Sequence, residues 1–229
     1  MDYTDKMLRY KESCIKKNEE LLRNGVFIMD TTNVYIDEDV EIGEDSIIYP
    51  NVHILKGSKI GKKVTILPNS FISNSLIGDD TTIDSSKIMD SEVGENSVVG
   101  PMSHLRNHTK IIGDARIGNF VEFKNSTFEK GSKCAHLTYI GDSDVGQKVN
   151  FGCGVVTVNY DGKSKFRTTI GDGAFIGSNV NLIAPVKVGK NALLAAGSTI
   201  DHDVDDGDMG IARSRQENKV GFGDKYKNK

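Results

Sequence analysis

Tryptophan is absent from this chain of 229 residues, proline occurs four times, and apolar residues make up 37%, a low share for a packed globular domain. No run of 18 apolar residues is present, so the sequence predicts no membrane span. The charged N-terminus lacks a signal-peptide core. Three scattered cysteines give no disulfide framework and indicate a reduced, cytoplasmic setting. A net charge of -3 gives no indication of a nucleic-acid partner.

What the sequence does contain is a six-residue repeat. Apolar residues occupy every sixth position from Ile36 to Ile72 without a break. A helix would need apolar spacings of three and four, whereas an even spacing keeps these side chains on one face of extended backbone. After slips of one residue the period resumes at Val93, Val99, Leu105, Ile111, Ile117 and Phe123, and again at Ile170, Ile176, Leu182, Val188, Leu194 and Ile200. We therefore predict an all-β structure along most of the chain.

A slower period groups three of these hexads into one coil. Tripeptides such as Ile42-Gly43-Glu44 and Ile60-Gly61-Lys62 recur every 16 to 19 residues, and we expect their glycines to supply the unusual backbone angles of a corner. Hexapeptide repeats of this kind are a signature of parallel β-helices. About nine coils over residues 34–204, stacked ~4.8 Å apart, predict a prism roughly 45 Å long.

The two ends of the chain differ from the repeat. The segment Tyr3–Arg23 is charged and free of glycine and proline. The heptad spacing of Leu8, Ile15 and Leu22 predicts an amphipathic helix, which Gly25 is expected to stop. We therefore expect an N-terminal connecting helix in residues 1–25, a β-helix domain in residues 26–220, and a flexible basic tail in residues 221–229.

The repeat is interrupted in two places, and an interruption that stability does not need is a candidate for function. Between Thr157 and Thr169 the sequence VNYDGKSKFRT contains a turn and three cations. This predicts a projecting loop, with a tolerated surface insertion as the alternative. The second interruption, residues 130–143, contains His136, although a lone histidine is more often structural than catalytic.

Residues 18 positions apart are expected to share a column of the prism. Arg106 and Lys124 each follow an inward apolar residue, so we expect their side chains on one face, about 5 Å apart. Two adjacent cations repel unless an anion joins them, and a phosphate suits an Arg and a Lys; an ordinary basic patch is the alternative. Ser178 and Ala196 form a second column, which predicts either a groove for a pantetheine arm or simply closer stacking of the coils.

Several long motifs carry a family resemblance over roughly residues 90–222: GPMSHLRNHTK, IGNFVEFKNS, KGSKCAHLTYIGD and VNFGCGVVTVNYDGKSKFRTTIGD. The chain resembles the C-terminal half of the bifunctional glucosamine-1-phosphate acetyltransferase and N-acetylglucosamine-1-phosphate uridylyltransferase family. This implies a left-handed β-helix, a homotrimer with active sites between subunits, and acetyl-CoA-dependent N-acetylation of glucosamine 1-phosphate for UDP-N-acetylglucosamine and peptidoglycan precursors. The family's Gly-rich nucleotide loop does not precede residue 25, so we expect no uridylyltransferase activity.

The resemblance also assigns roles to individual residues. His136 matches the general base that takes a proton from the sugar amine, which attacks acetyl-CoA directly without an acyl-enzyme. The positions that match sugar and phosphate contacts are Arg106, Lys124, Tyr139, Asn150 and Lys165. The positions that match the acetyl-CoA site are Cys153, Asn159, Tyr160, Ser178, Ala196 and Arg213. The chain departs from the family pattern at Asn107-His108, where Pro-Gly is usual, at Asn125, where a second Lys is frequent, and at Cys153, where Ala is common.

Three other functions are compatible with a hexapeptide β-helix. One is acetyl transfer to serine or to a nucleotide-linked amino sugar, and another is a non-catalytic scaffold or regulatory subunit. A γ-type carbonic anhydrase would need three zinc histidines in suitable columns, which the five histidines do not supply. Neither His104 with His108 nor Cys134 with His136 completes a familiar ligand set, so we expect no metal site.

Overall fold

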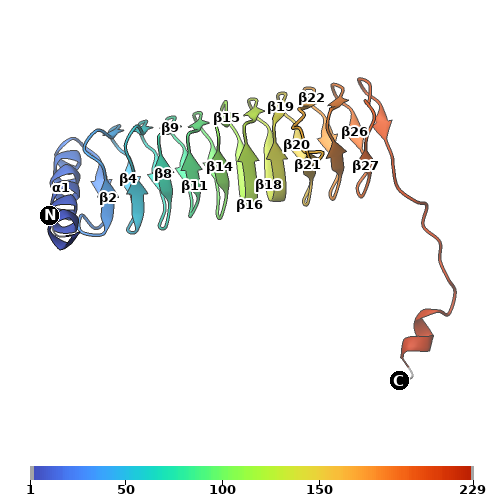
Figure 1. Ribbon diagram of the computed structural model, residues 1–229, viewed down its shortest axis with the longest axis horizontal. Coiled ribbons are helices and arrows are strands. Elements are labelled where there is room, and N and C mark those ends of the chain that lie inside the picture. The colour runs from blue at the N-terminus through green and yellow to red at the C-terminus, as the bar shows by residue number, and fades with distance from the viewer. Residues whose placement is uncertain (1–2, 228–229) are drawn as a thin grey trace.

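The computed structural model describes residues 3–227 and shows a three-sided prism of short parallel strands, capped at one end by helix α1 (Tyr3–Arg23) (Figure 1). Within those residues, no helix is long and apolar enough to cross a membrane. The first and second faces belong to one 19-stranded sheet, and the third face is a separate sheet of nine strands. The predicted parallel β-helix is therefore confirmed, and its third face has the expected nine strands.

The strands of the first face are β1 (Phe27–Ile28), β4 (Ile47–Ile48), β7 (Thr65–Ile66), β10 (Thr82–Ile83), β13 (Val98–Val99), the first parts of β16 (Arg116–Lys124) and β18 (Lys133–Gly141), β20 (Asn150–Phe151), β23 (Phe175–Ile176), β26 (Leu193–Leu194) and β28 (Met209–Gly210). The second face holds β2 (Val34–Ile36), β5 (Val52–Ile54), β8 (Phe71–Ser73), β11 (Lys87–Met89), β14 (His104–Arg106), the later parts of β16 and β18, β21 (Val156–Val158), β24 (Asn181–Ile183) and β27 (Thr199–Ile200). The third face holds β3 (Glu41–Ile42), β6 (Lys59–Ile60), β9 (Leu76–Ile77), β12 (Glu92–Val93), β15 (Lys110–Ile111), β17 (Thr127–Phe128), β19 (Ser143–Val145), β22 (Thr168–Ile170) and β25 (Val186–Val188).

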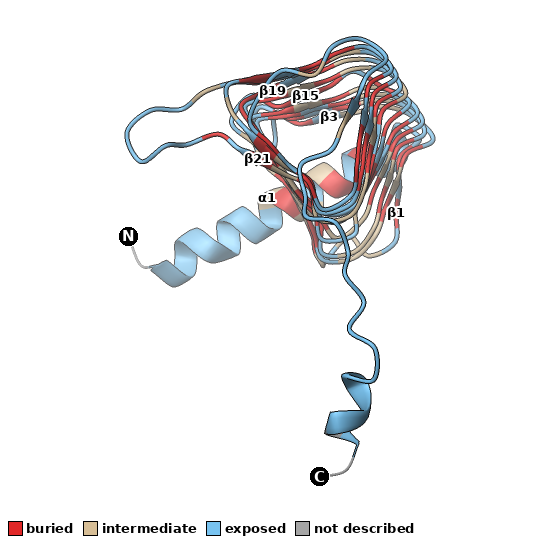
Figure 2. Cartoon of the chain, turned by 90° about the vertical axis from the view of Figure 1, so that its right-hand side faces the viewer, coloured by how far each residue is buried: buried red, intermediate tan, exposed pale blue. Residues whose placement is uncertain are grey.

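The coil winds with a left hand. Figure 2 looks along the prism from its C-terminal end, with β1 marking the first face at the right, β21 the second at the left and β3 the third at the top. The chain passes through the three faces in that order, clockwise, while it advances towards the viewer. This is the left-handed winding implied by the resemblance, and it is an exception to the usual right-handed crossover.

The hexad positions form the core. Ile36, Ile48, Ile54, Ile66 and Ile72 are fully buried, as the repeat predicts. Each such side chain contributes about 2 kcal/mol when buried. The core therefore consists mainly of aligned columns of branched aliphatic side chains, with one aromatic cluster formed by Phe123, Phe128 and Phe151.

Buried hydroxyls form a second ladder that the apolar period does not reveal. Ser132 Oγ, for example, accepts a hydrogen bond from Val149 N–H of the next coil at 2.9 Å and donates to the carbonyl oxygen of Gly146 at 2.8 Å. Ser97 accepts in the same way from Ala115 N–H at 3.3 Å. These hydroxyls satisfy backbone groups at corners where the strand ladder stops, and such groups are costly to bury unpaired.

The glycines of the Ile-Gly-X tripeptides have a different role from the one we expected. Left-handed backbone lies two residues further on, at Asp45 (φ 62°) and Lys63 (φ 54°). A Cβ on Gly43 would lie 2.7 Å from the backbone of Gly61 in the next coil, and one on Gly78 would lie 2.6 Å from the backbone nitrogen of Glu95. Close stacking of the coils, rather than the backbone angle, therefore selects glycine there.

The N-terminal helix covers the first coil. Its bounds agree with the prediction, but its buried residues are Cys14, Asn18 and Leu21, while Leu8 and Leu22 of the expected heptad stripe are exposed. The stripe is shifted because the helix packs across the end of the prism, against β1 and β2, and not against another helix among residues 3–227. Asn18 Nδ2 donates to the carbonyl oxygens of Thr31 and Val34 at 2.9 Å, which ties the helix to β2.

The helix ends where the sequence predicts. Gly25 adopts φ 84°, and Val26 N–H donates to the Leu21 carbonyl oxygen at 3.0 Å, a bond that closes the last turn. At the other end of the chain, the segment after β28 leaves the prism and includes a short 3-10 helix, Gly223–Tyr226 (Figure 1). Residues 228–229 of the predicted flexible tail lie outside the described residues, and its flexibility stays a prediction.

Candidate functional site

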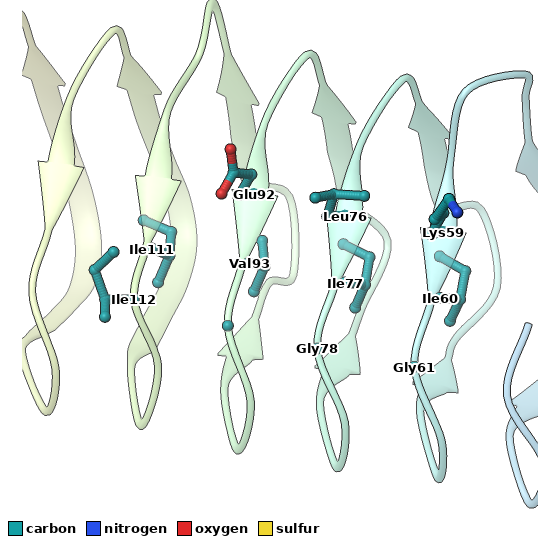
Figure 3. Close-up of a pocket in the computed structure, with 11 residues that line it drawn as sticks. Lys59, Ile60, Gly61, Leu76, Ile77, Gly78, Glu92, Val93, Ile111 and Ile112 are labelled. Carbon is teal, nitrogen blue, oxygen red and sulfur yellow. The ribbon is translucent and has the colours of Figure 1, made fainter.

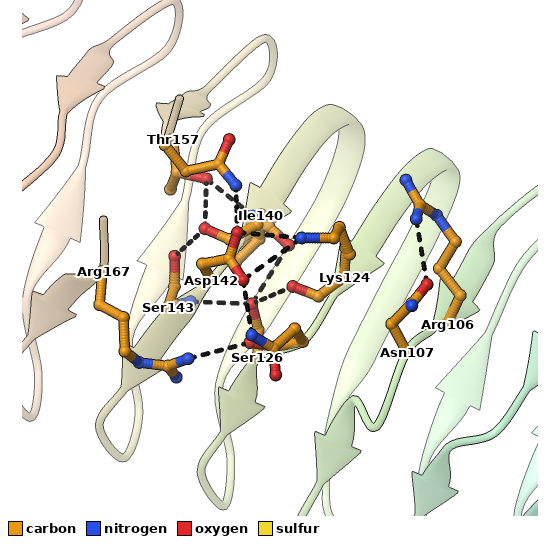
Figure 4. A network of polar contacts seen from close by, with 12 residues as sticks. Arg106, Asn107, Lys124, Ser126, Ile140, Asp142, Ser143, Thr157 and Arg167 are labelled. Atoms are coloured by element: carbon orange, nitrogen blue, oxygen red, sulfur yellow. Dashed lines mark hydrogen bonds and ion pairs between the residues drawn. The ribbon is translucent and has the colours of Figure 1, made fainter. Parts of the chain in front are cut away.

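The two cations predicted to share a column do share it, because Arg106 and Lys124 are register partners of β14 and β16. Each already has an acidic partner. Arg106 donates from Nε and Nη2 to Glu122 Oε1 at 2.8 and 2.6 Å. Lys124 Nζ lies 3.0 Å from Asp142 Oδ2 (Figure 4). The anions that join the two cations within this chain are carboxylates, and phosphate binding stays a prediction. Glu122 and Asp142 are the residues that the sequence reasoning missed.

Asp142 is the centre of this network. It is 5% exposed, and its carboxylate accepts from Lys124, from Asn125 Nδ2 at 2.5 Å and from Asn159 Nδ2. Burial alone would raise the pKa of Asp142, but the hydrogen bonds from Asn125, Lys124 and Asn159 outweigh it and lower the pKa. The carboxylate therefore stays ionised and fixes the side chains of Lys124 and Asn159. Asn125, which stands where the family frequently has a second lysine, is thus held by a hydrogen bond to Asp142.

Residues 159–167 leave the prism beside this network as a projecting loop, which Figure 2 shows at the left. An antiparallel bridge joins Tyr160 to Lys165, and Asp161 caps the turn by accepting from Lys163 N–H at 2.8 Å and Ser164 N–H at 2.6 Å. The exposed Tyr160 hydroxyl donates to the Gly162 carbonyl oxygen at 2.7 Å. The predicted loop is confirmed, and it has its own internal hydrogen bonds.

Lys165 brings a third positive charge to the network. The neighbouring ammonium of Lys124 lowers the pKa of Lys165. Burial lowers the pKa of Lys124 as well, but the Asp142 carboxylate more than compensates, so that this pKa is raised overall. We call Arg106, Lys124, Asp142, Asn159 and Lys165 the cationic corner. Arg106, Lys124 and Lys165 carry three positive charges, and Asp142 together with the adjacent Glu122 carries two negative charges. The cationic corner therefore has an excess of one positive charge.

The predicted base and three of the predicted acetyl-CoA positions form one column at a different corner, between the first and second faces. The backbone bonds that link them are Gly154 N–H to the His136 carbonyl oxygen at 3.4 Å, Asn179 N–H to that of Cys153 at 2.8 Å, and Gly197 N–H to that of Ser178 at 2.8 Å. We call His136, Cys153, Ser178 and Ala196 the base column. These four residues lie on successive coils. The exposed His136 comes first, and the small residues Cys153, Ser178 and Ala196 follow it along the same edge of the prism.

Three remaining predicted residues lie around these two clusters. Arg213 follows the last coil, where a Cβ on Gly197 would lie 3.8 Å from its Cδ, so it extends the base column. Tyr139 lies on the second face between the clusters, with its hydroxyl over Gly141. Asn150 lies on the first face, in register with Phe175, and is remote from the cationic corner of its own chain.

The cysteines differ in accessibility. Cys134 is buried within β18, and burial raises the pKa of its thiol to about 12, so it stays protonated near neutral pH. Cys153 is partly exposed in the base column. Within residues 3–227 no three His, Cys, Asp or Glu side chains are grouped closely enough to hold a metal ion.

A shallow hollow of about 390 Å³ lies on the third face, lined by residues such as Leu76, Glu92 and Ile112 (Figure 3). It contains no residue of the cationic corner or the base column. The charged side chains of this face are paired along the column, with Lys59 Nζ 3.0 Å from Glu41 Oε1. The hollow is a gap between surface side chains and contributes no catalytic chemistry.

Comparison with known proteins identifies two matching family models. The model of the GMPPB C-terminal domain matches residues 31–115, and that of the bacterial transferase hexapeptide (six repeats) matches residues 167–202. The structure of a UDP-N-acetylglucosamine acyltransferase from Campylobacter jejuni aligns with a TM-score of 0.45 and 17% identity over 81% of this chain and 71% of that one.

Sequence relatives give a closer match. Bifunctional protein GlmU from Exiguobacterium sp. strain AT1b is 52% identical over 217 residues, which cover 94% of this chain and 48% of the relative. The GlmU protein of Clostridioides difficile strain 630 is 53% identical over 212 residues, covering 93% and 46%. The chain thus spans about half the length of the curated relatives it matches. The chain is therefore a homologue of part of GlmU that contains bacterial transferase hexapeptide repeats.

Proposed function

We propose that this protein transfers the acetyl group of acetyl-CoA to the amine of glucosamine 1-phosphate and forms N-acetylglucosamine 1-phosphate. His136 accepts the amine proton while the nitrogen attacks the thioester carbonyl, and CoA leaves as the thiolate. An imidazole suits this role because it exchanges a proton near neutral pH. The exposed position of His136 next to partly exposed small residues of the base column supports the assignment.

The choice of a phosphorylated acceptor rests on one observation, the excess positive charge of the cationic corner. Arg106 and Lys124 are held by carboxylates on defined rotamers, and Lys165 brings a further cation from the loop. A phosphate monoester bound there relieves the repulsion between Lys124 and Lys165 and accepts hydrogen bonds from both. An acceptor without a phosphate gains nothing from this corner.

The two clusters lie at different corners of the prism, with the second face between them. His136 and Asp142 are six residues apart on and just after β18, which is at most roughly 20 Å of backbone. We propose that a homotrimer completes the site, with the base column of one subunit facing the cationic corner of its neighbour. Tyr139 and Asn150 then contact the sugar, and Tyr160, Ser178 and Arg213 lie along acetyl-CoA. No step in this mechanism requires a metal ion.

A thiol-release assay tests the reaction. Protein is supplied with acetyl-CoA and with glucosamine 1-phosphate, glucosamine, serine or a UDP-linked amino sugar in parallel. We expect CoA release with glucosamine 1-phosphate only, and a loss of at least about 100-fold in His136→Ala. Cys153→Ala is the matched control in the same column and stays active. A nearly active His136→Ala would sink the base assignment, and release with another acceptor alone would replace the substrate.

A further inference from the structure

The imidazole of His136 lacks a partner that sets its orientation. Its backbone is fixed, since the carbonyl oxygen accepts from Thr138 Oγ1 at 2.7 Å and from Gly154 N–H at 3.4 Å. Among residues 3–227, no side chain or backbone group is hydrogen-bonded to its ring. A histidine base works through one ring nitrogen, and the partner of the other nitrogen decides which one is free.

The coil below supplies a polar side chain in register with this histidine. Asn119 and His136 are Cα partners in the pairing of β16 with β18. These two strands, nine residues each, run through the corner without interruption, whereas neighbouring strands stop before it. Paired residues of parallel strands lie ~4.8 Å apart and direct their side chains the same way. The amide of Asn119 is therefore within reach of the ring.

The residues that follow this pair have unusual backbone angles. Phe120 and Leu137 adopt φ 55° and 46°, a region uncommon for bulky side chains. The next coils place Gly154 (φ 77°) and Asn179 (φ 56°) at the same corner, and these residue types tolerate it. Strain of this kind persists where the surrounding structure holds it, and it clusters at functional sites. Here the two coils have the same left-handed backbone conformation at the corner, which keeps the side chains of Asn119 and His136 parallel.

The other neighbour of His136 in the column is Cys153, on the coil above. A thiol is a weak hydrogen-bond acceptor, whereas an amide oxygen is a strong one. We propose that Asn119 is a positioning residue for His136: its Oδ1 accepts from Nδ1–H, so that the lone pair of Nε2 faces the substrate amine. This rests on the proposed function of His136 as base. The bond closes as the ring turns on substrate binding, since catalytic hydrogen bonds are often loose in free enzymes.

Nitrogen NMR of histidine-labelled protein tests the orientation without turnover, in the presence of acetyl-CoA and glucosamine 1-phosphate analogues that do not react. We expect the His136 ring to carry its proton at Nδ1 in the wild type and to be a mixture of the two tautomers in Asn119→Ala. Asn119→Asp keeps the Nδ1–H form, because a carboxylate oxygen accepts from the same ring nitrogen. Asn181→Ala, a partly exposed position on β24, is the matched control and leaves the spectrum unchanged. The same tautomer ratio in Asn119→Ala as in the wild type would overturn the proposal.

Kinetics then separate positioning from binding and from simple misfolding. We expect Asn119→Ala to lower kcat about tenfold with both KM values within about twofold, and Asn119→Asp to retain most of kcat. An unchanged kcat in Asn119→Ala contradicts the proposal. If the wild type releases no CoA with any acceptor, the proposed function fails by itself, and the tautomer spectrum still decides whether Asn119 orients His136.

Discussion

At the scale of the residue, Asp142 joins three side chains of the cationic corner and its surroundings through its carboxylate. It and Lys124 have side-chain exposures of 7% and 13%, so removal of the carboxylate leaves a buried ammonium unpaired. We expect Asp142→Ala to lower the free energy of unfolding by about 3 kcal/mol. Asp144→Ala is the control, because its pair with Arg167 is about half exposed and is worth less than about 1 kcal/mol. Urea denaturation of both variants measures the difference, and equal losses would contradict the assignment.

The same carboxylate makes stability depend on acid. Because the folded pKa of Asp142 is lowered, its contribution is fully present above the unfolded value of ~3.9 and is lost as the pH falls through the folded pKa. The difference between Asp142→Ala and the wild type should therefore shrink in acid. A difference that stays constant through that range would mean that Asp142 acts through packing alone.

At the scale of the element, the projecting loop should make the proposed binding of phosphate weaker at alkaline pH. Lys124 lowers the pKa of Lys165, so this cation loses its proton at a lower pH than an ordinary lysine. We expect the KM for glucosamine 1-phosphate to be constant at low pH and to rise as Lys165 deprotonates, measured between roughly pH 7 and pH 10. Lys165→Arg flattens this rise, while the neighbouring Lys163→Gln leaves it in place. A wild-type KM independent of pH would remove Lys165 from the site.

Some elements could be predicted from the sequence and others could not. The hexad period predicted the columns, the glycine-free N-terminal segment predicted the helix, and the interruption of the repeat predicted the loop, because each signal is a local pattern in the sequence. The buried stripe of α1 depends on the end of the prism it covers, which no heptad reveals. The partner of Lys124 was within reach, since Asp142 follows at the same 18-residue spacing that links Arg106 to Lys124. The partner of Arg106 was not, because Glu122 lies 16 residues on, diagonally across the ladder.

At the scale of the whole molecule, the separation of the two clusters predicts complementation between inactive variants. His136→Ala lacks the proposed base, and Lys124→Ala lacks the proposed phosphate contact. If each site combines the base column of one subunit with the cationic corner of its neighbour, every trimer that contains both variants has one complete site out of three, so about a third of the sites in mixed trimers are restored. Co-expression of differently tagged chains, followed by purification on both tags and the thiol-release assay, measures this. Two His136→Ala chains with different tags serve as the control and stay inactive, and mixed trimers without activity would place the whole site in one chain.

Within residues 3–227, a helix caps only the N-terminal end of the prism, and this decides where the coils begin to unfold. Each coil contacts only the coils before and after it, so the stack behaves like a zipper whose loss of structure starts at an unprotected end. Helix α1 closes the N-terminal end. At the other end β28 is two residues long and the chain then departs, so fraying begins there and reaches Ala196 and Ser178 before His136. Thermal fluctuation would therefore loosen the coils proposed to hold the acetyl donor first, while the coils of His136 and the cationic corner stay folded, and acetyl-CoA bound there would oppose this loss of structure.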